Sequence, residues 1–455
     1  MKLLLVIIYS LLLLKANSET SEYNYNSYSA VSTNTNLSGE TLSSTTSDQS
    51  VVYITSSGIT IDSSTIQKTS GDSSNTEDSE FYGVNAAILV QGGGVTITDG
   101  TITTAAKGAN AVCATNSGTV TISGTTIKST GSGSARGLHA TYGGQITASG
   151  VTISSTGGSC ATLATDRGEG TVTCSGCTLS TEGAGSPLIY STGTITVSET
   201  TGTASGAQMV VVEGKNTAIV QESSSLKCSG VGNRNNVDDC GIFLYQSMSG
   251  DADVGTSTFT CKESTFEIES TSSVYSSAPM FFITNTASAI NLEDCTFKYG
   301  SGTFLSSKAT SEWGKSGSNG GTVTLTLTNQ DIEGDFIVDS SSSLSITMVN
   351  SSIKGKINTD NESTNVAVTL DAASSIILTG NSYISSLTNG DTTGSNIYKG
   401  FYTLSDNNGK EYTATGNTTD DDTDTIHIIR NSALNNHSSY GLIFHIIILS
   451  TLILI

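Results

Sequence analysis

The chain has 455 residues, of which 13% are charged and 36% are hydrophobic, and it contains 48 glycines but only 2 prolines. This composition argues against a helical core and favours many short strands joined by tight turns. The formal net charge of −21 would repel nucleic acid and anionic lipid, so neither is an expected partner.

The N-terminus has the layout of a secretory signal peptide. Lys2 precedes an apolar run over residues 3–14, and the small residues Ala16 and Ser18 occupy the positions that a signal peptidase inspects. We therefore expect residues 1–18 to be removed and the mature chain to be extracytoplasmic. Residues 19–48 are rich in Ser, Thr and Asn, and we expect this N-terminal segment either to stay loose or to cap the fold that follows.

Internal repetition dominates the middle of the chain. The segments GTVTISGTTIKST (118–130), GQITASGVTISST (144–156) and GTVTCSGCTLSTE (170–182) share one frame. Starts of the repeats fall about 23 to 26 residues apart, and about twelve repeats fit between residues 49 and 380. A fixed period of this length is typical of a solenoid.

Each repeat contains three short candidate strands. Two pieces alternate between apolar and polar residues, and a third is a short apolar run such as residues 111–114. Alternation places Val120, Ile122 and Ile127 on one side and the intervening Thr and Ser on the other. Stacked coils would bury this apolar lining and pair every strand with its equivalent in the next coil.

This pattern resembles a known superfold. A coil of about 25 residues with the sequence GTVTISGTTI is similar to the right-handed parallel β-helix of the pectate-lyase-like superfold, and especially to its repetitive, adhesin-like surface members. The resemblance implies an all-β solenoid of about twelve three-stranded coils over residues 49–380. It specifies function less well, because the superfold includes lyases, hydrolases and adhesins. An antiparallel β-sandwich is the alternative fold.

Charged residues, which are scarce elsewhere, gather in the turns that leave the third strand of successive repeats. These turns include residues 166–170 (DRGEG), 213–216 (EGKN) and the long segment 246–255. Asp166 and Glu213 are two repeats apart, so a strand spacing of about 4.8 Å predicts a separation of about 9 to 10 Å between their carboxyls. That value is at the upper edge of the roughly 6.5 to 9.5 Å that suits inverting glycoside hydrolysis.

We expect this column of turns to be a ligand-binding edge. Its cations suit an acidic or sulfated sugar, and its tyrosines offer stacking faces. The candidate ligand-binding residues are Arg136, Tyr142, Asp166, Arg167, Glu169, Glu213, Lys215, Asp251 and Asp253. In the competing interpretation, these are turn residues whose charges pair within the chain. Asp166 and Glu213 are the catalytic pair only in an alternative hypothesis, because the motifs of polygalacturonases and pectate lyases are not found.

Three other features are expected to be structural. His139, the only histidine between residues 49 and 380, fits a stacked strand position better than a catalytic base. Among the eight cysteines, Cys228 and Cys240 flank one loop and are the favoured disulfide pair. The CxxC motif at residues 174–177 has no second CxxC or suitably spaced histidine pair, so neither a metal nor a cofactor is expected.

The C-terminus carries a second targeting signal. The composition of residues 381–431 predicts a cap followed by a hydrated acidic stalk. The acidic run 420–422 lacks the spacing of an EF-hand, so we expect a solvated linker there and not a calcium site. The apolar tail 442–455 is shorter than the roughly 20 residues of a spanning helix. Small residues and a polar spacer precede it, which predicts GPI attachment at Asn431 and removal of residues 432–455.

These features predict a protein on the extracellular face of the plasma membrane, with secretion as the alternative. Sequons predict N-glycosylation at Asn36, Asn350, Asn361 and Asn417. We expect an adhesin-like or coat protein whose partner is an extracellular glycan or a host or neighbouring cell surface, and whose only membrane contact is the lipid anchor. The alternative is a secreted polysaccharide-active enzyme. Ice binding would need a flat, uninterrupted threonine column, and the variation among the repeats argues against one.

Overall fold

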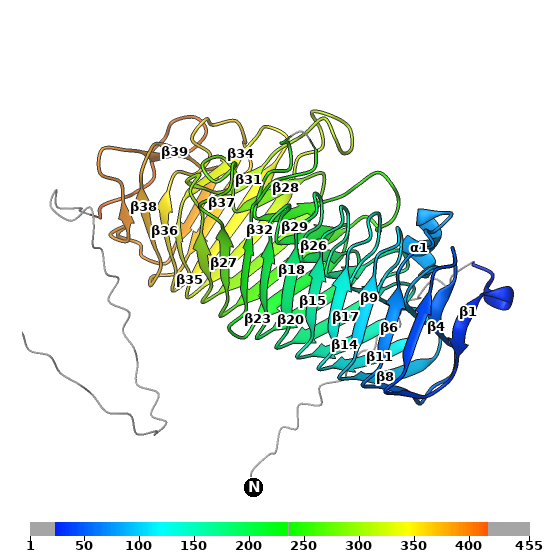
Figure 1. The fold of residues 1–455 in the computed structure, drawn as a ribbon. Coiled ribbons are helices and arrows are strands. Elements are labelled where there is room, and N and C mark those ends of the chain that lie inside the picture. Colours follow the sequence, from blue (N-terminus) through cyan, green and yellow to red (C-terminus); the bar gives the residue numbers. More distant parts are fainter. Residues whose placement is uncertain (1–22, 235, 417–455) are drawn as a thin grey trace, which may run out of the picture. The chain divides into compact units, whose positions relative to one another are not determined.

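A computed structural model describes residues 23–234 and 236–416 of the chain. Within this range the fold is a right-handed parallel β-helix, as the repeats predict, and Figure 1 shows its strands stacked as successive rungs. The helices in the described residues are a 3-10 helix, η1 (Tyr25–Ser27), which precedes the first strand, and one short α-helix, α1 (Thr76–Tyr82). None of the helices in these residues is long and apolar enough to cross a membrane.

Successive strands enter three long parallel sheets in turn. Sheet A contains β1 (Ala30–Thr33), β4 (Ser50–Ile54), β7 (Ile88–Gln91), β10 (Val112–Thr115), β13 (Leu138–Ala140), β16 (Leu163–Thr165), β19 (Ile189–Ser191), β22 (Val210–Glu213), β25 (Ile242–Tyr245), β28 (Phe281–Thr284), β31 (Thr303–Ser307) and β34 (Asp335–Val338). Sheet B contains β2 (Leu37–Ser38), β5 (Ile59–Asp62), β8 (Gly94–Thr98), β11 (Thr119–Ser123), β14 (Gln145–Ser149), β17 (Thr171–Ser175), β20 (Thr194–Ser198), β23 (Thr217–Gln221), β26 (Thr256–Lys262), β29 (Ala287–Glu293), β32 (Thr322–Thr328), β35 (Ser343–Val349), β37 (Val366–Leu370) and β40 (Ser386–Asn389).

Sheet C forms the third side for most of the β-helix. It contains β3 (Thr41–Ser44), β6 (Thr65–Lys68), β9 (Thr101–Thr104), β12 (Thr126–Ser129), β15 (Thr152–Ser155), β18 (Thr178–Thr181), β21 (Thr201–Ala204), β24 (Ser225–Cys228), β27 (Thr265–Ile268) and β30 (Thr296–Lys298). Two smaller parallel sheets follow near the C-terminal end. They contain β33 (Asp331–Glu333), β36 (Ser352–Gly355), β38 (Ser375–Leu378) and β41 (Ile397–Tyr398), and then β39 (Ser382–Tyr383) with β42 (Leu404–Ser405).

The β-helix extends into both segments that flank the predicted repeats. The first strands of sheets A, B and C, namely β1, β2 and β3, lie within residues 19–48. At the other end, β39, β40, β41 and β42 lie within residues 381–431. The sequence alternation is weaker in these outer coils because an end coil has only one neighbour to pack against.

The core is the apolar interior of the coils. Val120, Ile122 and Ile127 are at most 2% exposed, which confirms the predicted lining. In sheet B, Val120 aligns with Ile146 and Ile146 with Val172, so like residues stack from coil to coil.

Glycines allow the coils to approach each other at the corner between sheets C and A. A Cβ added at Gly157 would lie 1.7 Å from the carbonyl oxygen of Gly131, and one at Gly183 would lie 1.9 Å from that of Gly157. Both distances are shorter than any tolerable contact. The turns can therefore stack only because these positions have no side chain.

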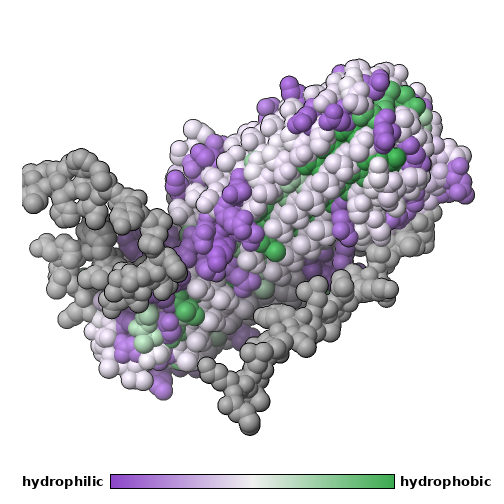
Figure 2. Space-filling view, turned by 90° about the horizontal axis from the view of Figure 1, so that it is seen from below, coloured by the Kyte–Doolittle hydropathy of each residue, from purple (hydrophilic) through white to green (hydrophobic). Residues whose placement is uncertain are grey.

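Threonines form long columns on the outer faces of sheets B and C, which Ser225 interrupts in sheet C and Ile219 and Asn291 interrupt in sheet B. The sheet C column has ten positions: Thr41, Thr65, Thr101, Thr126, Thr152, Thr178, Thr201, Ser225, Thr265 and Thr296. The central column of sheet B contains Thr60, Thr96, Thr121, Thr147, Thr173, Thr196, Ile219, Thr260, Asn291, Thr326, Thr347, Thr369 and Thr388. Figure 2 shows one face of the β-helix, where residues of intermediate hydropathy, coloured white, form successive rows.

Sheet A differs from the other two sheets because both of its faces are buried over its central strands. In β10, β13 and β16 every residue is buried, whereas β11 and β12 alternate between buried and exposed positions. Its outer face carries two apolar clusters, one around Leu89 and Cys113 and the other around Phe243 and Trp313. The ring centroids of Phe243 and Trp313 lie 5.1 Å apart. Trp313 therefore packs against the sheet. The outer face of sheet A between the two clusters contains the candidate site.

Candidate functional site

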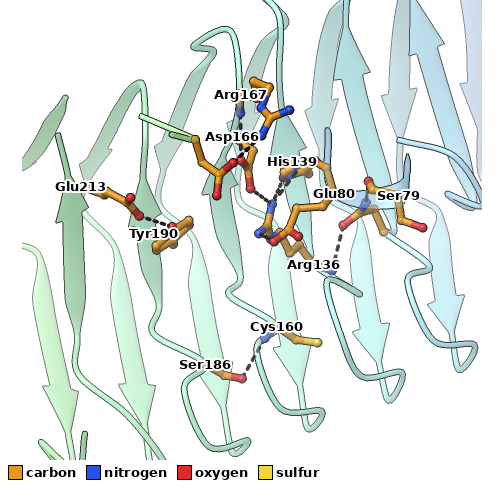
Figure 3. Close-up of polar contacts among 12 residues, drawn as sticks. Ser79, Glu80, Arg136, His139, Cys160, Asp166, Arg167, Ser186, Tyr190 and Glu213 are labelled. Atoms are coloured by element: carbon orange, nitrogen blue, oxygen red, sulfur yellow. Dashed lines mark hydrogen bonds and ion pairs between the residues drawn. The ribbon is translucent and has the colours of Figure 1, made fainter. Parts of the chain in front are cut away.

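A buried group of polar side chains lies on the outer face of sheet A, between the two apolar clusters (Figure 3). We call it the sheet A polar cluster, and its members are Glu80, Arg136, His139, Asp166, Tyr190, Glu213 and Tyr245. Five of these residues lie in or beside β13, β16, β19, β22 and β25, and Arg136 lies in the turn before β13. Glu80 comes from α1, which covers this part of the sheet.

Helix α1 is an insertion with its own capping residues. The Asn75 side chain accepts a hydrogen bond from the backbone N–H of Glu77, and Gly83 ends the helix in the left-handed conformation with φ of 71°. These are the usual residues at the two ends of a helix. The helix presents Glu80 and Phe81 to the turns of later coils.

Arg136 is the centre of the cluster. Its guanidinium lies 2.6 Å from Glu80 Oε1 and 2.6 Å from Asp166 Oδ2, and its side chain is only 6% exposed. Burial acts to lower the pKa of Arg136, but the Asp166 and Glu80 carboxylates outweigh it and raise that pKa. The guanidinium is thus a permanent positive charge between two carboxylates.

His139 is neutral in this environment. Its Nε2 lies 2.7 Å from the backbone carbonyl oxygen of Glu80, and Arg136 Nη1 lies 3.2 Å from its Nδ1. These contacts fit a ring that donates from Nε2 and accepts at Nδ1. Burial, and then the Arg136 charge, lower the pKa of His139 well below 6.5.

Asp166 is 2% exposed and anchored at both carboxyl oxygens. Oδ2 accepts from Arg136, and Oδ1 accepts from the backbone N–H of Arg167 at 2.8 Å. Burial raises the pKa of Asp166 above its ordinary value, and the guanidinium of Arg136 opposes that rise.

Glu213 is 1% exposed and is held by two tyrosines. Its Oε2 accepts from the hydroxyls of Tyr190 at 2.6 Å and Tyr245 at 2.7 Å. Burial, followed by the charge of Glu213, raises the pKa of both phenols well above 10. The guanidinium of Arg136 also lies over the ring of Tyr190, with its central carbon 5.6 Å from the ring centroid. The two halves of the cluster are therefore connected.

The loop 246–255 crosses the turns of earlier coils and covers the cluster. Arg167 Nη2 lies 2.7 Å from Asp251 in this loop, and its guanidinium carbon lies 3.8 Å from the ring centroid of Phe81 in α1. Lys215 Nζ lies 2.8 Å from Asp253 and 3.0 Å from Glu169. These partly exposed ion pairs fasten both insertions to the β-helix.

The candidate ligand-binding residues thus occupy two positions. Asp251, Asp253, Arg167, Glu169 and Lys215 form the partly exposed cover, whereas Arg136, Tyr142, Asp166 and Glu213 are buried. Tyr142 stacks on Tyr82 of α1 with a centroid distance of 5.7 Å and is 4% exposed. Sheet order places Asp166 and Glu213 two coils apart, as expected, but both belong to a covered cluster and not to an open edge.

Sequence reasoning missed Glu80 and Phe81 because they lie outside the repeat. A signal was present, since Ile66 and Ile102 are register partners but are 36 positions apart, well above the usual spacing. The extra length contains α1.

The predicted disulfide between Cys228 and Cys240 is wrong. Both are buried free thiols, and they face different environments: Cys228 lies in the interior of the coils, whereas Cys240 packs in the outer cluster around Phe243 and Trp313. The disulfides are Cys174–Cys177 and Cys261–Cys295. Both connect the end of a sheet B strand with the corner before sheet C.

Three of the predicted glycosylation sites lie in the described residues. Asn36 is exposed, and its side-chain oxygen accepts from the backbone N–H of Thr60 at 3.0 Å. Asn350 and Asn361 are half-buried, and their amides donate to Asn329 and Asn407. The predicted glycosylation site at Asn417 and the predicted anchor site at Asn431 lie outside the described residues, as do the predicted signal peptide and the apolar tail.

The described residues contain no group of three or more His, Cys, Asp or Glu side chains arranged to hold a metal ion. Chemically, the sheet A polar cluster offers buried carboxylates, one fixed cation and two phenols. Comparison with known proteins found no matching family model, no matching curated protein and no matching solved structure.

Proposed function

We propose that the chain is an adhesin-like or coat protein, displayed on the extracellular face of the plasma membrane by a GPI anchor. The observation that carries this proposal is the register of exposed threonines on sheets B and C. Thr121, Thr147 and Thr173 stack in adjacent coils of sheet B, and Thr126, Thr152 and Thr178 do so in sheet C. Hydroxyls repeat about every 4.8 Å along each column.

Such faces suit repeated hydrogen bonding to an extended, hydroxyl-rich partner. An extracellular glycan, or a host or neighbouring cell surface that carries one, has this chemistry. The central column of sheet B contains no charged residue, so a neutral glycan meets no electrostatic penalty there. A stacked sheet keeps the hydroxyls at fixed spacing, which reduces the ordering entropy lost on binding.

The test is the binding of the purified ectodomain to a glycan panel and to cells. Thr121→Val, Thr147→Val and Thr173→Val combined would remove three hydroxyls from sheet B and keep the β-branched shape. We expect weaker binding than for the wild type. The same three changes at Thr126, Thr152 and Thr178 measure the contribution of sheet C. Unchanged binding in both triple variants would contradict the proposal, and release from cells by a phosphatidylinositol-specific phospholipase tests the anchor.

A secreted polysaccharide-active enzyme is the alternative function. It requires Asp166 and Glu213 to reach a substrate, although Asp166 is bonded to Arg136 and Glu213 to two tyrosines under the loop 246–255. Depolymerisation of acidic or neutral polysaccharides that is lost in Asp166→Asn would favour the enzyme and overturn the adhesin proposal.

Ice binding is a second candidate that the threonine columns favour. In a tetrahedral network with O–H···O distances of about 2.75 Å, next-nearest oxygens lie about 4.5 Å apart, close to the roughly 4.8 Å strand spacing. Ice-crystal growth in the presence of wild-type protein and of Thr173→Lys is the test. Normal growth with the wild type would eliminate this candidate.

A further inference from the structure

Unpartnered polar atoms gather beneath the loop 246–255. Among the buried side-chain atoms without a hydrogen-bond partner in the described residues are Thr192 Oγ1, Glu213 Oε1 and Gln246 Oε1. The three residues are 1%, 1% and 6% exposed. All three atoms are oxygens, and one belongs to a carboxylate. A buried carboxylate oxygen without a partner is strongly unfavourable, so these atoms require a compensating ligand.

The register brings the three residues to the ends of neighbouring sheet A strands. Ser191 pairs with Val212, so the following residues, Thr192 and Glu213, stack in adjacent coils about 4.8 Å apart. Gln246 follows Tyr245, which is the register partner of Glu213. Its Oε1 lies 3.1 Å from the position that a Cβ at Gly214 would take. The three residues therefore lie at neighbouring strand ends, around the end of β22.

The surrounding charge is negative. The cluster and its cover contain six carboxylates and three cations, so their formal net charge is 3 − 6 = −3. The carboxylates are Glu80, Asp166, Glu169, Glu213, Asp251 and Asp253, and the cations are Arg136, Arg167 and Lys215. Each of these cations is paired with another carboxylate, and none of the ion pairs in residues 23–234 and 236–416 includes Glu213. Glu213 thus has hydrogen bonds to Oε2 but no counter-charge.

We propose that Glu213 Oε1, Thr192 Oγ1 and Gln246 Oε1 form a calcium site under the loop 246–255. Carboxylate, carbonyl and hydroxyl oxygens suit a hard cation, whereas transition metals prefer nitrogen or sulfur donors. With a single carboxylate, the site matches the weak class of extracellular calcium sites, with dissociation constants of roughly 10⁻⁴ to 10⁻³ M. Its donor set is mostly neutral, which is why no cluster of acidic residues in the sequence marks it.

Calcium at this position would link three coils and the base of the cover. Thr192 follows β19, Glu213 ends β22 and Gln246 follows β25. Gln246 also begins the covering loop, and its Nε2 donates to the backbone carbonyl oxygen of Ala252 at 3.1 Å. Binding would therefore tighten the loop over the sheet A polar cluster, in addition to neutralising Glu213.

The experiment compares thermal unfolding of the full chain in chelator and in millimolar calcium chloride. We expect the Tm of the wild type to begin to rise near the dissociation constant given above and to keep rising with the logarithm of the calcium concentration, and we expect Glu213→Gln to show no rise. The glutamine retains an acceptor for Tyr190 and Tyr245, so the variant keeps those hydrogen bonds. Glu222→Gln, at an exposed turn after β23, is the matched control and is expected to respond like the wild type.

A second readout uses terbium(III) as a luminescent substitute for calcium. The phenols of Tyr190 and Tyr245 contact the same carboxylate, so excitation of tyrosine should sensitise terbium emission. Emission should be displaced by calcium, lost in Glu213→Gln and weakened in Thr192→Val. An equal response in the wild type and Glu213→Gln, or no response in either assay, would overturn the site. A Tm that rises with sodium or potassium chloride but not with calcium would overturn the assignment to calcium.

Discussion

Replacement of Arg136 by methionine is the most direct test of the sheet A polar cluster. The change removes the cation that lies 2.6 Å from both Glu80 and Asp166 while keeping much of the side-chain volume. Asp166 is 2% exposed, so its carboxylate would remain buried without a counter-charge. Breaking a buried pair in this way typically lowers the free energy of unfolding by about 3 to 5 kcal/mol.

Arg167→Met is the matched control. Arg167 pairs with Asp251 at side-chain exposures of 35% and 24%, and it stacks on Phe81. A partly exposed ion pair contributes about 0 to 1 kcal/mol and an exposed cation–π contact about 0.5 to 1 kcal/mol. We therefore expect Arg136→Met to lower the free energy of unfolding by at least about 1 kcal/mol more than Arg167→Met, roughly a fivefold difference in the unfolding equilibrium.

The assay is urea denaturation followed by circular dichroism at several pH values. Without Arg136, burial and the Glu80 charge act on Asp166 against only the backbone hydrogen bond from Arg167, so its folded pKa should lie further above the unfolded value of 3.8. The folded variant then binds more protons than the unfolded variant as the pH falls through this window, and its deficit relative to the wild type should shrink. Equal destabilisation by Arg136→Met and Arg167→Met, or a deficit that does not change with pH, would refute the argument.

Three further outcomes are expected. The pKa of His139 is held well below 6.5 in the folded protein, so only the unfolded chain gains this proton as the pH falls below about 6.5. The free energy of unfolding should therefore decrease in that range. His139→Leu should abolish this part of the pH dependence in denaturation experiments. Gly157→Ala should lower the Tm strongly, since its Cβ would lie 1.7 Å from a backbone oxygen. Gly158→Ala is the control and should be nearly neutral, because the nearest atom to its Cβ would be 3.4 Å away. Similar Tm values for the two variants would contradict the stacking argument. The Cys261–Cys295 disulfide joins residues 34 apart, and its removal (Cys261→Ser with Cys295→Ser) should lower the free energy of unfolding by roughly 4 kcal/mol. The Cys174–Cys177 disulfide joins residues 3 apart, and its removal (Cys174→Ser with Cys177→Ser) should lower it by roughly 2 kcal/mol. A larger loss for the second double variant in denaturant unfolding would refute the loop-entropy estimate.

The repeats were sufficient to predict the β-helix, its interior and the relative positions of Asp166 and Glu213. Each of these features depends on period-2 alternation within a coil and on stacking between coils, and both are visible in the sequence. The environment of the turn column was not predictable in the same way. It depends on α1 and the loop 246–255, which occur once each and therefore have no repeat with which to align them.

The disulfides show where a closer use of the repeat would have succeeded. Cys174 and Cys261 occupy one column of sheet B, connected by Val197 and Val220. Their partners, Cys177 and Cys295, each precede a sheet C strand in the same register, β18 and β30. Both bonds thus join the same two columns, whereas proximity along the chain suggested Cys228 and Cys240, whose side chains lie on opposite sides of the coil wall.

The two proposals concern different faces of the β-helix, so their experiments are independent. Thr→Val changes on sheet B leave Glu213 and Thr192 in place and should not alter the calcium response. Glu213→Gln leaves the threonine columns in place and should not alter adhesion through sheets B and C. The exception would be a partner that also contacts the loop 246–255, where Met248 is 74% and Val254 84% exposed. In that case calcium, by fixing the base of the loop at Gln246, would strengthen adhesion, and adhesion that depends on calcium in the wild type but not in Glu213→Gln would place the loop in the binding surface.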